Sequence, residues 1–207
     1  MQTTIPGDRV EIASRFNRLL AVCVWVIAAL IAGSLFFVGP GAPLLTLIPA
    51  AFFSLLAWEA LWRPYTAVTD EGVELRNVFR TIRIPWAALI NVDTKYALTL
   101  YTPGHKYVAW SAPAPGHVTS LRNSRSTGSE SQAGLSASAE VRPGDLINTE
   151  SGQAAAVVRS RWTRLRDLGL VEAGVADETA VVITRHTLII VVLSVLALAT
   201  MVASLSS

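Results

Sequence analysis

Three long apolar blocks dominate the pattern of hydrophobic and polar positions along the chain. They cover residues 19–38, 44–62 and 187–205, and the first runs for twenty residues without a charge. A helix rises about 1.5 Å per residue, so a block of this length matches the ~30 Å hydrocarbon core of a bilayer. The pattern therefore predicts three transmembrane helices.

A cleaved signal peptide is the alternative interpretation of the first block, because Arg15 and Arg18 precede it. Signal peptides have a shorter apolar core and are followed by soluble sequence. Here a second apolar block follows after only the turn-forming residues 39–43. We therefore predict a transmembrane helical hairpin at residues 19–62.

Between the second and third blocks, apolar and polar residues alternate with a period of two. A first strand precedes the turn at residues 70–72. The alternation is plain at residues 73–76 and 80–84, continues through Leu89, Ile90 and Val92, and returns at 95–102 and 106–110. This period places one row of side chains on each face of a strand. Six short strands joined by tight turns within about 45 residues are typical of an antiparallel meander that curls into a barrel or sandwich.

An amphipathic helix is predicted at residues 153–168, and Gly169 is placed to end it. A serine-rich insertion at about 117–152 precedes it. We expect at least residues 123–139 of the insertion to be mobile, because they hold too few large apolar side chains to offset the entropy of ordering. The helix has an apolar stripe (Ala155, Val158, Trp162, Leu165) and a surface rich in arginine (Arg159, Arg161, Arg164, Arg166).

This helix has two interpretations. Its stripe packs on the β-meander and leaves the arginines in solvent, or the helix lies on an anionic membrane surface. We favour the first interpretation, because a sheet that is buried on one face needs a cover.

Composition and charge agree with a membrane protein and remove other classes. The 207 residues are 52% hydrophobic and only 15% charged, and the mean hydropathy is +0.45, whereas soluble proteins hold about 25% charged residues. The net charge of +2 gives no overall basic footprint, so no nucleic-acid partner is expected. The single cysteine, Cys23, excludes an internal disulfide and a multi-cysteine zinc site.

The arginines are placed asymmetrically about the apolar blocks. They precede the first block, follow the second and precede the third, whereas the hairpin loop and the C-terminal tail carry no charge. The positive-inside rule then predicts a plasma (inner) membrane protein with its N-terminus and central domain in the cytoplasm and its C-terminus outside. The predicted parts are an N-terminus at 1–18, the hairpin at 19–62, a β-domain at 63–168, a connector at 169–186, and a third transmembrane helix with its tail at 187–207.

Glu59 is the one acid inside an apolar block. An acid within a membrane span is a functional candidate by default. Arg63, however, lies four residues later, in the order that favours an ion pair on one helix face. Trp58 and Trp62 flank the acid as in an interfacial aromatic belt. We favour an interfacial ion pair that anchors the end of the helix.

The sequence after the hairpin resembles a known family. Residues 65–73, YTAVTDEGV, and 82–86, IRIPW, are similar to the Y-x-V-T-D … R-x-I-P pattern of bacterial membrane-anchored pleckstrin-homology (PH) proteins. The actinobacterial family of the low molecular weight protein antigen 6 type also has a transmembrane hairpin ahead of its domain. The resemblance implies an α+β membrane protein with a PH-like barrel of two antiparallel sheets and a C-terminal helix. A PH fold has seven strands, and we expect the seventh from the region after Pro113.

The sequence contains no catalytic constellation, cofactor motif or metal-ligand spacing. His105, His117 and His186 stand apart from one another and from cysteines and acids at ligand spacing. We therefore expect a protein that is not an enzyme and binds no cofactor.

Three functions remain open. We favour a binding or scaffold module whose PH-like domain engages a protein partner at the inner membrane face. The alternatives are a reader of anionic lipid headgroups, and an accessory subunit of a membrane enzyme or transporter that uses Glu59. Basic side chains near an anionic membrane contribute about 1 kcal/mol each. The candidate lipid or partner contacts are Arg80, Arg83, Lys95, Arg159 and Arg161.

Overall fold

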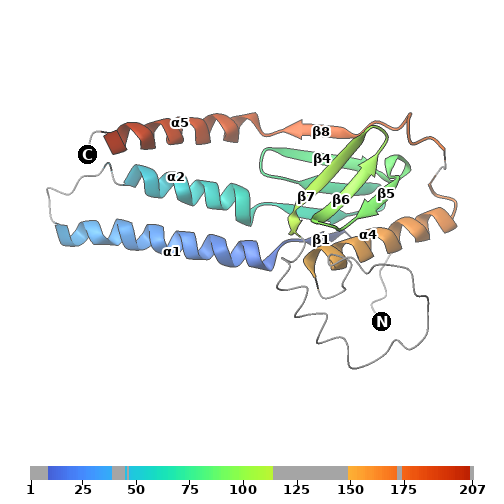
Figure 1. The fold of residues 1–207 in the computed structure, drawn as a ribbon, viewed down its shortest axis with the longest axis horizontal. Helices are drawn as coiled ribbons and strands as arrows, with labels where there is room; N and C mark the ends of the chain where they lie inside the picture. Colours follow the sequence, from blue (N-terminus) through green and yellow to red (C-terminus); the bar gives the residue numbers. More distant parts are fainter. Residues whose placement is uncertain (1–8, 39–44, 46, 114–148, 172–173, 206–207) are drawn as a thin grey trace, which may run out of the picture.

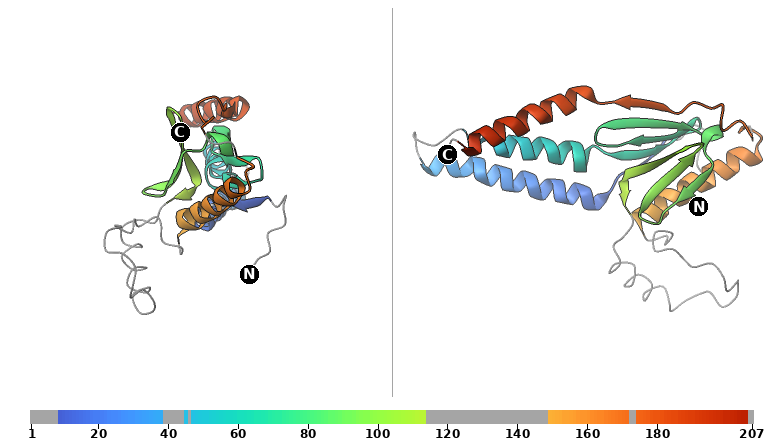
Figure 2. Two further views of the ribbon diagram at one scale, coloured as in Figure 1. Left: turned by 90° about the vertical axis from the view of Figure 1, so that its right-hand side faces the viewer. Right: turned by 45° about the horizontal axis from the view of Figure 1, so that its top comes forward.

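The computed structural model describes residues 9–38, 45, 47–113, 149–171 and 174–205. Most of the connection inside the hairpin lies outside these residues, as do residues 117–148 of the insertion, which include the predicted mobile part at 123–139. Figures 1 and 2 show three helices side by side and a β-domain at one end of them. The helices that lie side by side are α1 (Arg15–Val38), α2 (Leu47–Ala57) with a following π-helical turn (Trp58–Trp62), and α5 (Thr187–Leu205). A fourth helix, α4 (Glu150–Asp167), packs on the β-domain.

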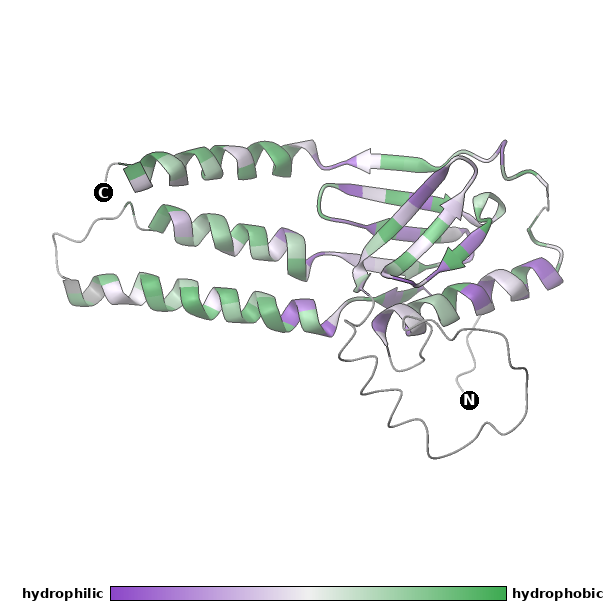
Figure 3. Cartoon of the chain, in the orientation of Figure 1, coloured by the Kyte–Doolittle hydropathy of each residue, from purple (hydrophilic) through white to green (hydrophobic). Residues whose placement is uncertain are grey.

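Two of these helices are long and apolar enough to cross a membrane, namely Arg15–Leu35 within α1 and Thr187–Leu205. The segment Leu47–Trp62 is apolar but shorter. Almost none of the residues in the two long helices are buried within the protein, and Figure 3 shows that hydrophobic residues make up most of the length of each. α2 packs against both α1 and α5. By length and composition, therefore, the described residues hold two candidate spans and one shorter apolar helix.

Eight strands form two antiparallel sheets in the described part of the chain. One sheet has the order β1-β2-β3-β4-β8 and the other the order β5-β6-β7. Strands β2 to β7 are the six strands that the period-two alternation predicts. The strands are β1 (Val10–Ile12), β2 (Tyr65–Val68), β3 (Gly72–Arg76), β4 (Arg80–Pro85), β5 (Asn91–Asp93), β6 (Ala97–Thr102), β7 (His105–Pro113) and β8 (Val182–Arg185).

Two strands lie in segments that we predicted to be only a terminus and a connector. β1 precedes α1 and pairs with β2, so that Val10 lies opposite Val68. β8 pairs with β4 and ends directly before α5. The strand expected after Pro113 is thus β8, and β1 adds another. Both segments are rich in β-branched residues, which pack well on a pleated surface, and each extends one edge of the five-stranded sheet.

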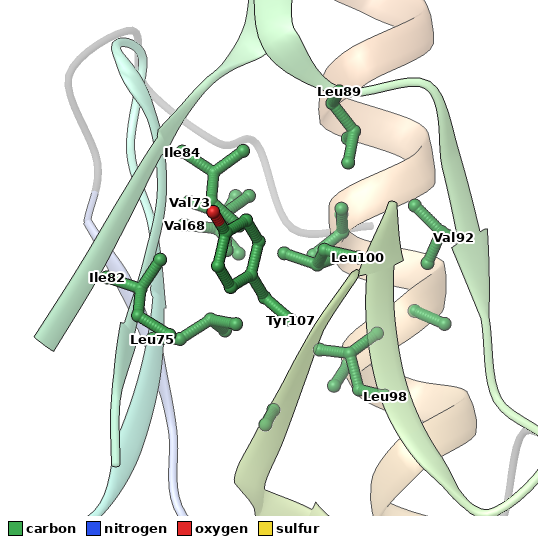
Figure 4. Close-up of a cluster of buried hydrophobic side chains, with 14 of the residues drawn as sticks. Val68, Val73, Leu75, Ile82, Ile84, Leu89, Val92, Leu98, Leu100 and Tyr107 are labelled. Carbon is green, nitrogen blue, oxygen red and sulfur yellow. The ribbon is translucent and has the colours of Figure 1, made fainter. Parts of the chain in front are cut away.

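The hydrophobic core lies between the two sheets and α4. Figure 4 shows inner-face side chains of both sheets meeting, among them the fully buried Leu75 and Leu100. α4 packs against β2, β5, β6 and β7. It contributes Val158 and Leu165 to the core, and Trp162 packs against the same cluster. The prediction that the apolar stripe of this helix covers the β-meander is confirmed.

Recognisable caps fix both ends of α4. The Thr149 hydroxyl accepts a hydrogen bond of 3.0 Å from the backbone N–H of Gly152, so the helix begins at residue 150 and not at the predicted residue 153. Gly169 follows the helix with a φ of 70°, and the backbone N–H of Leu170 donates to the carbonyl of Leu165 at 3.0 Å. This is a Schellman ending, as predicted for Gly169.

One arginine of α4 is not in solvent. The side chain of Arg161 is only 8% exposed, and its Nη2 lies 2.8 Å from Oδ1 of Asp70 in the turn between β2 and β3. The expectation that the arginines of this helix are all solvated is therefore wrong at Arg161. Two residues earlier in the helix, Nη2 of Arg159 donates to the carbonyl oxygen of Val92 in β5 at 2.8 Å. Both side chains hold α4 against the β-domain.

Candidate functional site

The outer face of the five-stranded sheet carries a connected group of charged side chains. Successive side chains in a strand point to opposite faces, and the register places Glu74 of β3 directly opposite Arg83 of β4. Tyr65 of β2 lies diagonally across from Glu74 on the same face. Arg9 and Glu11 complete the group at the β1 edge. We call these five residues the Glu74 network.

Glu74 is the centre of this network. Its Oε1 accepts a hydrogen bond from the Tyr65 hydroxyl at 2.7 Å and lies 3.7 Å from Nη2 of Arg9. Its Oε2 accepts from Nε of Arg83 at 2.7 Å. Arg9 also donates to the Tyr65 hydroxyl at 3.2 Å and pairs with Glu11 at 2.8 Å. Both carboxylate oxygens of Glu74 are thus held by neighbouring strands.

The network lowers the pKa of Glu74. Burial raises the pKa of this carboxyl, but the hydrogen bonds from Tyr65 and Arg83 and the positive charges of Arg83 and Arg9 together outweigh burial. A hydrogen bond to Tyr65 raises the pKa of Arg9, and a hydrogen bond to Glu74 raises the pKa of Arg83. At neutral pH the sheet face therefore presents fixed charges of both signs.

We expect the full chain to lose stability in acid as Glu74 becomes protonated. A folded-state pKa below the ordinary value of 4.5 means that the carboxylate stabilises the fold above the unfolded-state pKa, and that this contribution is lost as the pH falls through the lowered pKa. The test compares the melting temperatures of the wild type and Glu74→Gln at about pH 7 and about pH 3. The gap between them should be largest at neutral pH and close in acid, and a gap independent of pH would contradict the assignment.

A groove of about 370 Å³ lies at one end of the charged face. Because β2 follows α2 directly, the β2–β3 turn that lines the groove lies at the end of the sheet away from the helices. A Cβ on Gly72 would lie 2.1 Å from the carbonyl oxygen of Ile84, so the two backbones leave no room for a side chain there. Arg9, Glu71 and Arg83 line the groove together with Glu74. The groove therefore carries charges of both signs.

The opposite end of the β-domain places aromatic and basic side chains against the helices. The rings of Trp25, Trp58 and Trp62 lie with centroids 5.2–6.3 Å apart, and the Arg18 guanidinium lies 5.4 Å from the Trp62 ring centroid. Trp110 of β7 donates its indole N–H to a carbonyl in the π-helical turn at 2.6 Å. The ring contacts thus join α1 to the π-helical turn, and the Trp110 hydrogen bond joins β7 to the same turn.

The predicted ion pair between Glu59 and Arg63 is present in the π-helical turn. Glu59 is only 4% exposed, and one carboxylate oxygen accepts from the Arg63 guanidinium. The Glu-then-Arg spacing of four residues brings both side chains to one face, as the sequence predicts.

The five candidate contact residues do not converge on one surface. Arg80 lies at the start of β4 near α5, and Arg83 belongs to the Glu74 network. Lys95 lies in the turn between β5 and β6 over the ring of the neighbouring tyrosine. Arg159 and Arg161 hold α4 in place. The structure therefore brings together only parts of this set, with different neighbours.

The described residues offer no cluster of three or more histidines, cysteines or acids that could hold a metal ion. The ring of His105 stacks on Tyr107 with centroids 6.2 Å apart. The ring nitrogens of His186 lie 3.0 Å from the Thr81 hydroxyl and 3.4 Å from the carbonyl of Val78. His117 lies outside the described residues.

The Glu74 network is the group that the sequence reading missed. The turn predicted between residues 73–76 and 80–84 is enough to place Glu74 opposite Arg83, because it pairs these two strands. No sequence pattern indicates that Arg9 joins this network, because the whole helical hairpin lies between β1 and β2 along the chain.

Comparison with known proteins identifies the central part of the chain. Residues 63–143 match the family model of the bacterial PH domain, and this segment contains β2 to β7. No curated protein and no solved structure matches the chain. The two antiparallel sheets followed by α4 have the architecture that the resemblance implied, while the likeness to the actinobacterial proteins stays a prediction. The described residues of the matched segment therefore form a PH-like domain, with strands added from both sides of that segment.

Proposed function

We propose that this chain is a non-catalytic, multi-pass membrane protein that holds its PH domain at the cytoplasmic face of the membrane to bind a protein partner. One observation carries the proposal. Three apolar helices join a single sheet of the PH domain, while the charged groove of that sheet lies at its far end. A tethered domain that presents a polar groove away from its anchor suits a binding module.

The joints between helices and sheet are short. Residues 13–14 separate β1 from α1, residues 63–64 separate the π-helical turn from β2, and His186 alone separates β8 from α5. With links this short, the near ends of all three helices meet the same side of the domain (Figure 1). Leu47–Trp62 extends about 24 Å at 1.5 Å per residue, less than the ~30 Å hydrocarbon core, and a bilayer accommodates a short helix by local thinning. These features support three spans with the N-terminus and the PH domain on one side of the membrane.

A reporter fusion tests this topology. The arginines near the domain-facing helix ends support a cytoplasmic PH domain. A periplasmic-type reporter fused after Ser207 should be active, and the same reporter inserted near Gly116 should be inactive. The reverse pattern, or equal activity at both sites, would contradict the proposed topology.

The direction of α4 favours a protein partner over a lipid surface. Oε1 of Glu150 accepts a hydrogen bond of 2.8 Å from the backbone N–H of Arg15, so α4 begins beside the first residue of α1. Its 18 residues extend about 27 Å, and the helix runs away from the apolar helices (Figures 1 and 2). Arg164 and Arg166 near its end are then far from headgroups of the membrane that anchors the chain.

Photo-crosslinking in native membranes tests for the partner. A photoreactive amino acid replaces Glu71, which is exposed and lines the groove, and in a matched variant it replaces Lys106, which is exposed on the other sheet. We expect discrete protein adducts from position 71 and none of the same mass from position 106. Lipid adducts alone from position 71 would contradict the protein-partner proposal and favour a lipid reader, and identical adducts from both positions would remove the groove as the site.

A further inference from the structure

A second pocket lies where the helices meet the sheet. It has a volume of about 420 Å³ and lies between the end of α2 and the start of α5. Its lining is polar at the sheet end and apolar along α5. The residues that matter here are Glu59, Arg63, Arg185, His186, Leu188 and Val192. A pocket with charged and apolar parts in this order has the amphipathic character of a phospholipid.

Glu59 brings an unsatisfied acceptor to this pocket. One of its carboxylate oxygens is held by Arg63, but the buried Oε2 has no hydrogen-bond partner among the described residues. The residue is 4% exposed, and a buried charged oxygen without a donor is destabilising because nothing replaces the hydration that it loses. The arrangement therefore points to a donor supplied from outside the described chain.

The arginines at the sheet end of the pocket lack a negatively charged partner in the part of the chain that the structure describes. Arg185 of β8 lies directly opposite Arg80 of β4 in the ladder. Like charges in directly opposed positions are destabilising, and neither arginine forms an ion pair with a carboxylate of the described residues. An anion beside Arg185 would remove this repulsion.

The polar wall of the pocket is held in place by the β3–β4 turn. The backbone N–H of His186 donates to the carbonyl of Phe79 at 2.9 Å, and its ring contacts the Thr81 hydroxyl and the Val78 carbonyl. Arg185 precedes this anchored residue and Leu188 follows it by two positions. The pocket lining therefore changes from charged at Arg185 to apolar at Leu188 within the first turn of α5.

We propose that this pocket binds one anionic phospholipid whose headgroup carries hydroxyl groups beyond its phosphate. The phosphate contacts Arg185 and Arg63, a hydroxyl donates to Oε2 of Glu59, and an acyl chain follows Leu188 and Val192 along α5. Three arginines (Arg63, Arg80, Arg185) against one carboxylate (Glu59) leave a local charge of 3 − 1 = +2, which favours a lipid of net negative charge. The inference rests on the proposed membrane insertion, and the site is separate from the groove beside Gly72.

Native mass spectrometry of the full chain in detergent tests the proposal. Phosphatidylglycerol and phosphatidylcholine with the same acyl chains are supplied in turn. We expect a retained adduct of one phosphatidylglycerol and little phosphatidylcholine. Arg185→Gln should weaken phosphatidylglycerol binding about tenfold, the equivalent of one charge-assisted contact. The matched variant Arg164→Gln, on α4 away from the pocket, should bind as the wild type does.

Three results would overturn the site. They are equal retention of both lipids, equal weakening by Arg185→Gln and Arg164→Gln, and displacement of the lipid by inorganic phosphate, which would identify a free-anion site. Carbonate extraction of membranes distinguishes a failure of the proposed lipid site from a failure of the proposed membrane insertion. A chain that stays in the membrane pellet but shows no lipid selectivity loses only the lipid site, whereas a chain extracted into the supernatant loses both proposals.

Discussion

Replacing Gly72 with alanine is expected to destabilise the PH domain by about 3 kcal/mol, in the range of overpacking substitutions. The added Cβ would lie 2.1 Å from the carbonyl oxygen and 2.9 Å from the carbonyl carbon of Ile84. Both are backbone atoms of the neighbouring strand, so relief requires the β3–β4 ladder to move. Thermal unfolding of the full chain in detergent measures the effect, and a chain of this size should lose roughly 6–12 °C in melting temperature.

Gly33→Ala in α1 is the matched control for this change. A Cβ on Gly33 meets no atom within 4 Å, and alanine is a better helix former than glycine. The melting temperature of Gly33→Ala should therefore stay the same or rise slightly. If both substitutions have the same effect, the contact between Gly72 and Ile84 is not what requires glycine.

Truncation of Leu75 to alanine should cost about 3 kcal/mol as well, within the range of about 2–5 kcal/mol for buried leucines. Leu75 lies in β3, the central strand of the five-stranded sheet, and has no exposed surface. Its inward side chain meets residues of the second sheet (Figure 4), so removing it leaves a cavity lined from two sheets. Chemical denaturation followed by tryptophan fluorescence measures the loss.

The control for Leu75 lies on an edge of the same sheet. Ile183 in β8 is 43% exposed, and its truncation to alanine should cost less than about 1 kcal/mol. An equal loss at both positions would mean that the core is not centred between the two sheets, as we describe it.

Much of the fold follows from periodicity in the sequence. Strands β2 to β7 appear as runs with a period of two because each buries one face, and α4 appears because Val158, Trp162 and Leu165 recur at helical spacing. The third apolar block coincides with α5, Thr187–Leu205. These elements can be predicted from a single sequence because each depends on the spacing of residues that are close together along the chain.

The edge strands could not be assigned in the same way. β1 and β8 each stand just before an apolar block, outside the series of alternating runs and turns that marks β2 to β7. Their pairing with β2 and β4 depends on where the adjoining apolar helices place them, and this depends on contacts between residues far apart in the sequence. The same limit applies to the sites. Arg161 looks like any exposed arginine in sequence, and its burial against Asp70 follows from how α4 docks on the β2–β3 turn.

The position of β8 also dictates when the domain is completed during synthesis. Residues 86–181 separate β4 from β8 along the chain, so all of them must leave the ribosome before β4 gains its outer neighbour. Until then the edge of β4 is open, and open edges invite pairing with other chains. Because His186 alone separates β8 from α5, the strand that closes this edge emerges from the ribosome together with the start of that apolar helix.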